Sequence, residues 1–227
     1  MGAISHLIKI GFPNNCITCN DSLLRNEKFI CSNCFFFIPK GESTISKESE
    51  TNSLLGNHQS LIGGGHLFNF DKDGKTQQLL HELKYNSNIQ LGTFLGELIG
   101  AEFKSQLKHI DFIIPVPLHK KKLYERGYNQ SEVLSNGINN VIEKKISIDN
   151  LIRTKYTETQ TKKNKLERIE NIKNAFEINN PQDLEGKSIL LIDDVITTGS
   201  TLAECINSFD SVKNIKITVM VLAKAVY

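Results

Sequence analysis

Three mainly apolar runs in the second half of the chain predict buried strands. They cover residues 110–116, 188–192 and 215–223, and none alternates strictly between apolar and polar residues. Such runs are typical of parallel sheets whose two faces are both covered by helices. Shorter strands are expected at 66–70, 151–154 and 175–178. The pattern therefore predicts an α/β fold with a central, mainly parallel sheet flanked by helices.

Four other segments repeat their apolar residues every three or four positions, as helices with one buried face do. The clearest stripe lies in 91–103 and consists of Leu91, Phe94, Leu95, Leu98, Ile99 and Phe103. Shorter stripes predict helices over 76–85, from residue 131 onward and from residue 202 onward. The last stripe includes Cys205, which we expect to pack in the core rather than to react.

Residues 41–60 interrupt this series of strands and helices. The segment is rich in Ser, Glu and Asn and has no apolar period, so it predicts a linker or surface loop. It separates a small N-terminal module, residues 1–40, from a main domain that spans residues 61–227. A chain of 227 residues is long enough for one α/β domain and such an appendage.

The strand at 188–192 runs into the sequence DDVITTGST, in which we expect Asp193 and Asp194 to end the strand. Ligands of open α/β sheets bind at the carboxyl ends of strands, and a loop that enters a helix offers free N–H groups to phosphate. Gly199 lets the backbone approach an anion. The two carboxylates suit sugar hydroxyls or a bridging cation. A sugar phosphate fits both halves, whereas the alternative is a capped helix without a ligand.

This stretch resembles the motif with which type I phosphoribosyltransferases bind 5-phosphoribosyl 1-pyrophosphate (PRPP). The resemblance implies that the carboxylates bind the ribose hydroxyls and that the following loop binds the 5-phosphate. The implied PRPP-binding set is Asp193, Asp194, Val195, Thr197, Thr198, Gly199, Ser200 and Thr201.

One departure from that motif concerns catalysis. Relatives that act on purines carry an Asp at the position of Thr197, so general acid–base help to a purine is not expected here. Orotate-type relatives also lack this Asp, and transferase activity therefore stays open. No catalytic residue is assigned.

The N-terminal module contains two Cys-x-x-Cys pairs. Cys16 and Cys19 are followed, after eleven residues, by Cys31 and Cys34. Four thiolates from two such pairs suit a tetrahedral structural Zn²⁺, which would supply much of the folding energy of the module. Two disulfides or unrelated thiols are the alternative, although five Cys, an odd number, argue against a disulfide scaffold. The next residues, 35–37, are all Phe and pack either within the module or onto the main domain.

Two basic segments follow the strand at 110–116. Residues 119–130 read HKKKLYERGYNQ and predict a basic loop, and 155–174 form a long charged segment typical of a mobile functional loop. Both have the charge that a pyrophosphate group requires. The first also combines cations with aromatic rings, as surfaces that bind single-stranded nucleic acid do. A solvated charged surface is the alternative.

The net charge of +2 is too small to indicate a nucleic-acid partner by itself. Residues 119–173 hold 13 Lys and Arg against 7 Asp and Glu, a local charge of +6, which leaves −4 for the remainder. No run of 18 apolar residues occurs, and the first residues lack the features of a signal peptide. We therefore expect a cytoplasmic protein without a transmembrane segment.

Taken together, the motifs resemble those of the ComF family of competence-associated proteins, also called GntX-like. The resemblance covers almost the whole chain. It is carried by the two Cys pairs and by HELKYNSNIQLGTFLGELI, DFIIPVPLHKKKLYERGYNQSEVL, LIRTKYTETQTKKNKLERIENIKNAFEI and LLIDDVITTGST. It implies a type I phosphoribosyltransferase fold with an N-terminal zinc module, and PRPP bound together with Mg²⁺.

The resemblance also implies a role in natural transformation, in which the protein handles single-stranded DNA as it enters the cytoplasm. The implied partners are PRPP, single-stranded DNA and a competence helicase or other uptake machinery, which can hold the protein at the inner face of the membrane. The alternative is an active phosphoribosyltransferase of nucleotide or related metabolism whose acceptor is unknown.

The resemblance divides the basic residues between two roles. Residues 117–126 correspond to the pyrophosphate loop and residues 155–174 to a hood loop over the site. The pyrophosphate and hood candidates are Leu118, His119, Lys120, Arg126, Lys84, Lys162 and Arg168. The nucleic-acid candidates are Lys120, Lys121, Lys122, Tyr124, Arg126 and Tyr128.

Overall fold

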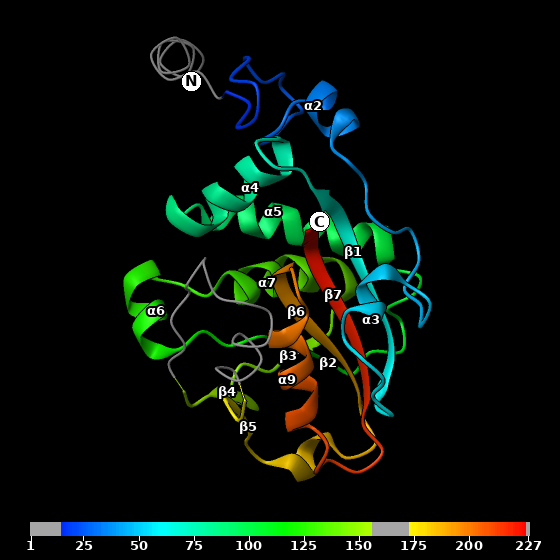
Figure 1. Cartoon of the computed structure of the whole chain (residues 1–227). Coiled ribbons are helices and arrows are strands. Elements are labelled where there is room, and N and C mark those ends of the chain that lie inside the picture. Colours follow the sequence, from blue (N-terminus) through cyan, green and yellow to red (C-terminus); the bar gives the residue numbers. More distant parts are fainter. Residues whose placement is uncertain (1–14, 156–172, 226–227) are drawn as a thin grey trace.

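A five-stranded parallel sheet forms the centre of the computed structural model, which describes residues 15–155 and 173–225 (Figure 1). The strand order is β1–β7–β6–β2–β3, and each neighbouring pair is parallel. The strands are β1 (Leu61–Phe70), β2 (Phe112–Pro115), β3 (Lys145–Ile146), β6 (Ser188–Ile196) and β7 (Lys216–Ala225). The parallel sheet predicted from the apolar runs is confirmed.

Helices and a small antiparallel pair of strands accompany this sheet. The antiparallel pair is β4 (Leu151–Arg153) with β5 (Phe176–Ile178). The helices are α2 (Ser32–Phe37), α3 (Glu50–Ser53), α4 (Lys75–Tyr85), α5 (Ile89–Phe103), α6 (Lys120–Arg126), α7 (Gln130–Ile142), the 3₁₀ helix η1 (Pro181–Leu184) and α9 (Ser200–Ser208). The helices expected from the four apolar stripes correspond to α4, α5, α7 and α9.

Two apolar cores cover the two faces of the sheet. Leu190 and Ile192 of β6 belong to the core that includes α4, α5 and α7. Ile189 and Leu191 of the same strand belong to the core that includes α9, where Cys205 is fully buried. Because successive side chains of a strand point to opposite faces, a strand covered on both sides is apolar at every position.

Helices α5 and α7 pack with their backbones in unusually close contact. A Cβ added to Gly96 would lie 2.2 Å from the carbonyl oxygen of Leu134, and one added to Gly137 would lie 2.0 Å from that of Thr93. The two glycines therefore define how closely α7 approaches α5. This matters for the site, because α7 begins next to the carboxyl ends of β2 and β6.

Strand β6 is longer than the sequence pattern predicts. It continues through Asp193 and Asp194 to Ile196, and Asp193 pairs with Val221 while Ile196 pairs with Lys224. The expectation that the acidic pair ends the strand is wrong, because β7 continues alongside and supplies backbone hydrogen-bonding partners. The residues placed in a loop before the next helix are thus reduced to 197–199.

Residues 41–60, predicted as a linker, pack along the edge of the sheet. Ser46 forms an antiparallel bridge with Gly64 of β1, and Lys40, just before the segment, forms one with Phe68. The chain here therefore covers the edge of that strand. Its short helix α3 buries Thr51, and Leu55 after it is 2% exposed. Whether 41–60 marks the boundary of an independent domain stays a prediction.

The cysteine-rich module rests on α4 and α5. Cys16, Cys31 and Cys34 belong to the same core as Leu79 and Leu80 of α4. Of the three consecutive Phe residues, Phe35 packs against Phe68 of β1, whereas Phe36 and Phe37 are exposed.

Within residues 15–155 and 173–225, no helix combines the length and apolar character that a membrane span requires.

Candidate functional site

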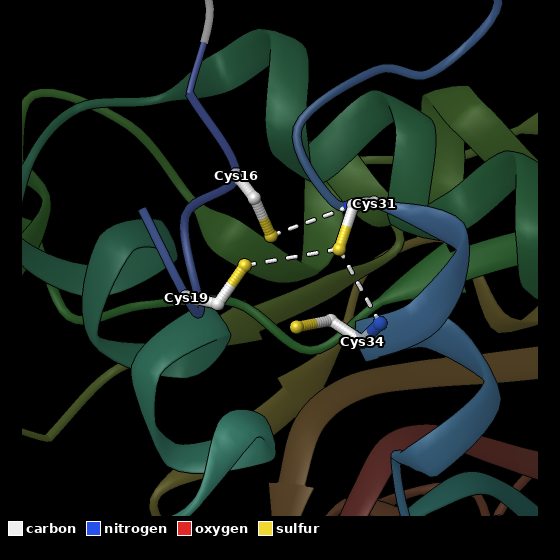
Figure 2. Close-up of side chains that lie close together, drawn as sticks. All are labelled: Cys16, Cys19, Cys31 and Cys34. Atoms are coloured by element: carbon white, nitrogen blue, oxygen red, sulfur yellow. Dashed lines mark hydrogen bonds between the residues drawn. The ribbon is translucent and has the colours of Figure 1, made fainter. Parts of the chain in front are cut away.

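The four predicted cysteine ligands converge on one point. Cys16 and Cys19 lie on a turn, Cys31 caps α2 and Cys34 lies in its first turn (Figure 2). Their sulfur atoms all lie within 4.8 Å of one another, and those of Cys19 and Cys31 are 3.8 Å apart. A tetrahedron with metal–sulfur bonds of about 2.3 Å has edges of about 3.8 Å. The cluster can therefore hold a metal ion.

Hydrogen bonds to the sulfur atoms favour the thiolate form at one of these positions. The backbone N–H of Cys31 donates to Sγ of Cys16, and the N–H of Cys34 donates to Sγ of Cys31. Burial raises the pKa of Cys16, but hydrogen bonds from Thr18 and from backbone N–H groups outweigh it and lower the pKa to about 6. A thiolate is the form that binds metal.

The acidic pair lies at the carboxyl end of β6 and turns toward two different helices. Oδ1 of Asp193 accepts hydrogen bonds from the hydroxyl of Ser131 in α7, at 3.0 Å, and from the N–H of Asp194, at 2.9 Å. Burial and then the charge of Asp194 raise the pKa of Asp193 to about 7. The carboxylate of Asp194 forms an ion pair with Lys84 of α4, at 3.0 Å.

The loop that follows forms a small depression of about 30 Å³ at the start of α9. It is lined by residues 193 and 195–202, which include almost the whole predicted PRPP motif. The hydroxyls of Thr198 and Ser200 lie 2.8 Å apart and are hydrogen bonded to each other. Loop hydroxyls and the N-terminus of α9 thus gather next to the acidic pair, as an arrangement for a sugar phosphate requires.

Gly199 is required by the packing of the loop, which the sequence did not indicate. Its φ angle is +77°, and a Cβ at this position would lie 2.1 Å from the carbonyl oxygen of Leu54. Leu54 belongs to the segment 41–60, next to α3. The glycine therefore lets this segment lie directly against the loop, in addition to any approach by an anion.

The basic stretch after β2 is mainly helical, which corrects the expectation of a basic loop. His119 caps α6 by accepting a hydrogen bond from the N–H of Lys121 at 3.2 Å, and Gly127 ends the helix in the left-handed conformation. Leu118 and His119 lie between the end of β2 and this helix, half-buried. The helix therefore begins after the cap at His119 and ends at Gly127.

Three cations meet in a cavity of about 310 Å³ between α4 and α6, which we call the basic cavity. It is lined by Lys84, Tyr85, Ser87, Lys122, Glu125 and Arg126, so one carboxylate faces the three cations. Burial and then the charges of Arg153, Arg126 and Lys84 lower the pKa of Lys122. Three cations against one carboxylate leave the cavity with an excess of positive charge, which favours a multiply charged anion.

The nucleic-acid candidates separate into exposed and buried residues. Lys120, Lys121 and Tyr124 are exposed on α6, and Tyr124 is 90% exposed. Tyr128 instead is 8% exposed, and its hydroxyl donates to the carbonyl oxygen of Leu83. Its ring packs in the core and is not available for base stacking, so this assignment is corrected. Lys162 and Arg168 lie outside the described residues.

Two residues at the site are not among the candidates that the sequence predicts. Ser131 contacts Asp193 from the first turn of α7. Arg153, at the end of β4, lies over the ring of Phe176 at 5.2 Å, and its charge affects both Asp193 and Lys122. Arg153 belongs to the stretch LIRTKYTETQ, which carries the resemblance to the ComF family, so that motif was the available signal.

The fold and the site define the class of the protein. A model of the phosphoribosyl transferase domain family matches residues 129–225, which include β6, its loop, α9 and β7. The chain is therefore phosphoribosyltransferase-like. A solved structure of the allosteric regulatory enzyme of purine biosynthesis matches 69% of the chain and 32% of its own length, with 14% identity and a TM-score of 0.43.

Similar proteins place the chain more narrowly. Competence protein ComFC of Bacillus subtilis is 38% identical over 194 residues, which cover 82% of this chain and 74% of that protein. Competence protein F of Haemophilus influenzae is 34% identical over 133 residues, covering 56% of this chain and 58% of the relative. The chain belongs to the ComF family.

The DNA utilization protein YhgH of Escherichia coli O157:H7 is 33% identical over 131 residues, which cover 56% of this chain. The chain spans 57% of the length of that protein. The names of these relatives refer to competence and to DNA utilization.

Proposed function

We propose that this protein binds PRPP together with Mg²⁺ and acts in natural transformation, where it handles single-stranded DNA that enters the cytoplasm. The observation that carries the proposal is the meeting of three groups at the carboxyl end of β6. These are the acidic pair Asp193 and Asp194, the hydroxyl-rich loop 197–201 and the cations around Lys84. The competence and DNA utilization proteins among the relatives support the physiological role.

Each part of PRPP has a counterpart in this arrangement. Asp193 and Asp194 would bind the ribose hydroxyls, and the loop 197–201 would bind the 5-phosphate. The basic cavity would bind the pyrophosphate. Lys84 connects the two halves, because it is paired with Asp194 and also lines the basic cavity. Mg²⁺ would supply further neutralisation of the pyrophosphate charge.

The test is calorimetric titration of PRPP with Mg²⁺ into the wild type and into Asp193→Asn/Asp194→Asn. We expect PRPP to bind the wild type and its affinity to fall at least about one hundredfold in the double variant. Two carboxylates that accept hydrogen bonds from the ribose hydroxyls are weakened together. Asp183→Asn/Asp210→Asn makes the same charge change at positions outside the acidic pair and should bind PRPP normally. No binding to the wild type, or an equal loss in the control, would refute the PRPP site.

The exposed face of α6 supports an interaction with single-stranded DNA. Lys120 and Lys121 offer charge, and the exposed ring of Tyr124 offers a stacking surface. Lys122 and Arg126 also belong to the basic cavity, so their charges are shared with the pyrophosphate site. The DNA surface proposed here is therefore smaller than the sequence suggested.

Fluorescence anisotropy with a labelled oligothymidine at several salt concentrations tests this surface. We expect affinity to fall steeply with salt, and Lys120→Ala/Lys121→Ala to reduce the salt slope by about two. Lys187→Ala/Lys213→Ala removes two lysines that precede the first residues of β6 and β7, at the end of the sheet away from the acidic pair. This control should leave the salt slope unchanged. A flat salt response would contradict DNA binding.

An active phosphoribosyltransferase is the second candidate function. In that reaction a lone pair of the acceptor forms a bond to C1 of PRPP while the C1–O bond to pyrophosphate breaks. Pyrophosphate leaves with the bonding pair, and a proton on the acceptor passes to water. The open cavity beside the loop, described below, favours this candidate. Release of pyrophosphate in the presence of an acceptor tests it.

In the N-terminal module we propose that the four cysteines bind zinc with a structural role. The distances between their sulfur atoms and the thiolate character of Cys16 support this choice. Metal analysis of the purified protein should give one equivalent of zinc, and Cys16→Ser/Cys34→Ser should abolish it. A disulfide between any two of them would contradict the proposal.

A further inference from the structure

A second cavity lies beside the loop 197–201, the proposed site of the 5-phosphate. Its volume is about 510 Å³, which is within the usual range for small-molecule sites. It shares Val195 with the depression formed by the loop, and it also shares Thr197. Lys84 and Tyr85 of α4 line both this cavity and the basic cavity. We call it the α4 cavity, and its position places it next to both parts of the PRPP site.

Much of the α4 cavity is apolar and aromatic. Phe70 at the end of β1, Leu80 of α4 and Val195 of β6 contribute apolar surface. On α4, the rings of His81 and Tyr85 lie together, with centroids 4.9 Å apart. A flat ring can bury its faces against such surfaces, whereas a flexible polar molecule would gain little from them.

The charged groups of the α4 cavity are Lys72 and Lys84, and the imidazole of His81 lies in the same lining. None of the described residues that line the cavity is Asp or Glu. Lys84 already forms an ion pair with Asp194 at 3.0 Å. Lys72 and His81 are the other basic side chains in the lining that can face a ligand. A cavity lined by one sign of charge favours a ligand of the opposite sign. The ligand should therefore be an anion.

We propose that the α4 cavity binds the second substrate of the site and that this substrate is a flat aromatic acid. Its ring would lie against the apolar surface, and its carboxylate would face Lys72 and His81. As the acceptor, this acid rests on the proposed PRPP site, and the inference names the class of acceptor that the site would take. The carboxylate adds affinity only if these basic residues bind it.

Three pairs of probes test the proposal by calorimetry: benzoate with benzamide, nicotinate with nicotinamide, and orotate with uracil. Each acid is compared with a neutral counterpart, with and without PRPP. We expect at least one acid to bind about tenfold more tightly than its neutral counterpart. Lys72→Gln should reduce the affinity for that acid about fivefold and leave the neutral molecule unaffected. Lys104→Gln, at the exposed C-terminus of α5, is the matched control and should change neither.

The outcomes separate this inference from the PRPP proposal. If PRPP binds but no acid binds more tightly than its neutral counterpart, the inference is wrong and the PRPP site stands. If an acid binds in the absence of PRPP and PRPP itself does not bind, the inference about the cavity stands and the PRPP proposal fails. An equal effect of Lys72→Gln and Lys104→Gln would show that the acid binds elsewhere and would overturn the inference.

Discussion

Substituting Gly199 by Ala tests how the loop 197–201 is held in place. Two costs arise in the structure. The residue has φ +77°, a left-handed conformation that costs an L-residue about 1–2 kcal/mol. The new Cβ would also lie 2.1 Å from the carbonyl oxygen of Leu54, whereas ordinary contacts begin at 3.4 Å. One of the two segments must move by about 1.3 Å, the difference between these distances.

Leu54 cannot move without disturbing its surroundings. Its N–H donates to the carbonyl oxygen of Thr51, and the adjacent Leu55 is 2% exposed in the core beneath. Overpacking of this kind costs roughly 1–3 kcal/mol. The sum predicts that Gly199→Ala destabilises the protein by about 2–5 kcal/mol. The loop should also lose affinity for PRPP, because its backbone must shift.

Gly186→Ala is the matched control for backbone strain. Gly186 also has a positive φ, +69°, but a Cβ there would meet no atom within 4 Å. Urea unfolding of the two variants should therefore give a loss of about 1–2 kcal/mol for Gly186→Ala and a clearly larger loss for Gly199→Ala. Equal losses in the two variants would refute the argument that contact with Leu54 requires this glycine.

Three further predictions concern helix packing, pH and metal. Gly96→Ala should destabilise the protein by more than about 2 kcal/mol, despite a helix-propensity gain of about 1 kcal/mol, because its Cβ meets a backbone carbonyl. Gly92→Ala, whose Cβ meets side-chain atoms and no backbone, should lower the thermal stability less. The raised pKa of Asp193, about 7, means that the ligand-free folded state binds more protons than the unfolded state between pH 4 and 7. Stability should therefore fall as pH rises through this window, and Asp193→Asn should remove the fall in urea titrations at several pH values. Chelation of the proposed zinc ion should increase hydrogen exchange in residues 15–38 while β6 and β7 stay protected. Loss of protection throughout the protein would contradict a local role for the module.

Much of the fold follows from local patterns that are visible in the sequence. The apolar run around Leu190 predicts a strand covered on both faces, and the stripe around Leu95 predicts the helix α5. These predictions succeed because burial of one face or of two faces leaves a period in the sequence itself. The spacing of the four cysteines likewise predicts their convergence, since two knuckles of fixed geometry can meet at one ion.

The tertiary structure decided which distant residues meet at the site. Lys84 pairs with Asp194 across more than one hundred positions, and Gly199 contacts Leu54 from a segment that the sequence presents as a linker. Tyr128 carries the same aromatic signal as Tyr124, but only Tyr124 is exposed. Contacts of this kind depend on how α4, α6 and the segment 41–60 pack against the strands of the sheet. No local period records that packing, because each contact involves single residues from elements that are far apart in the chain.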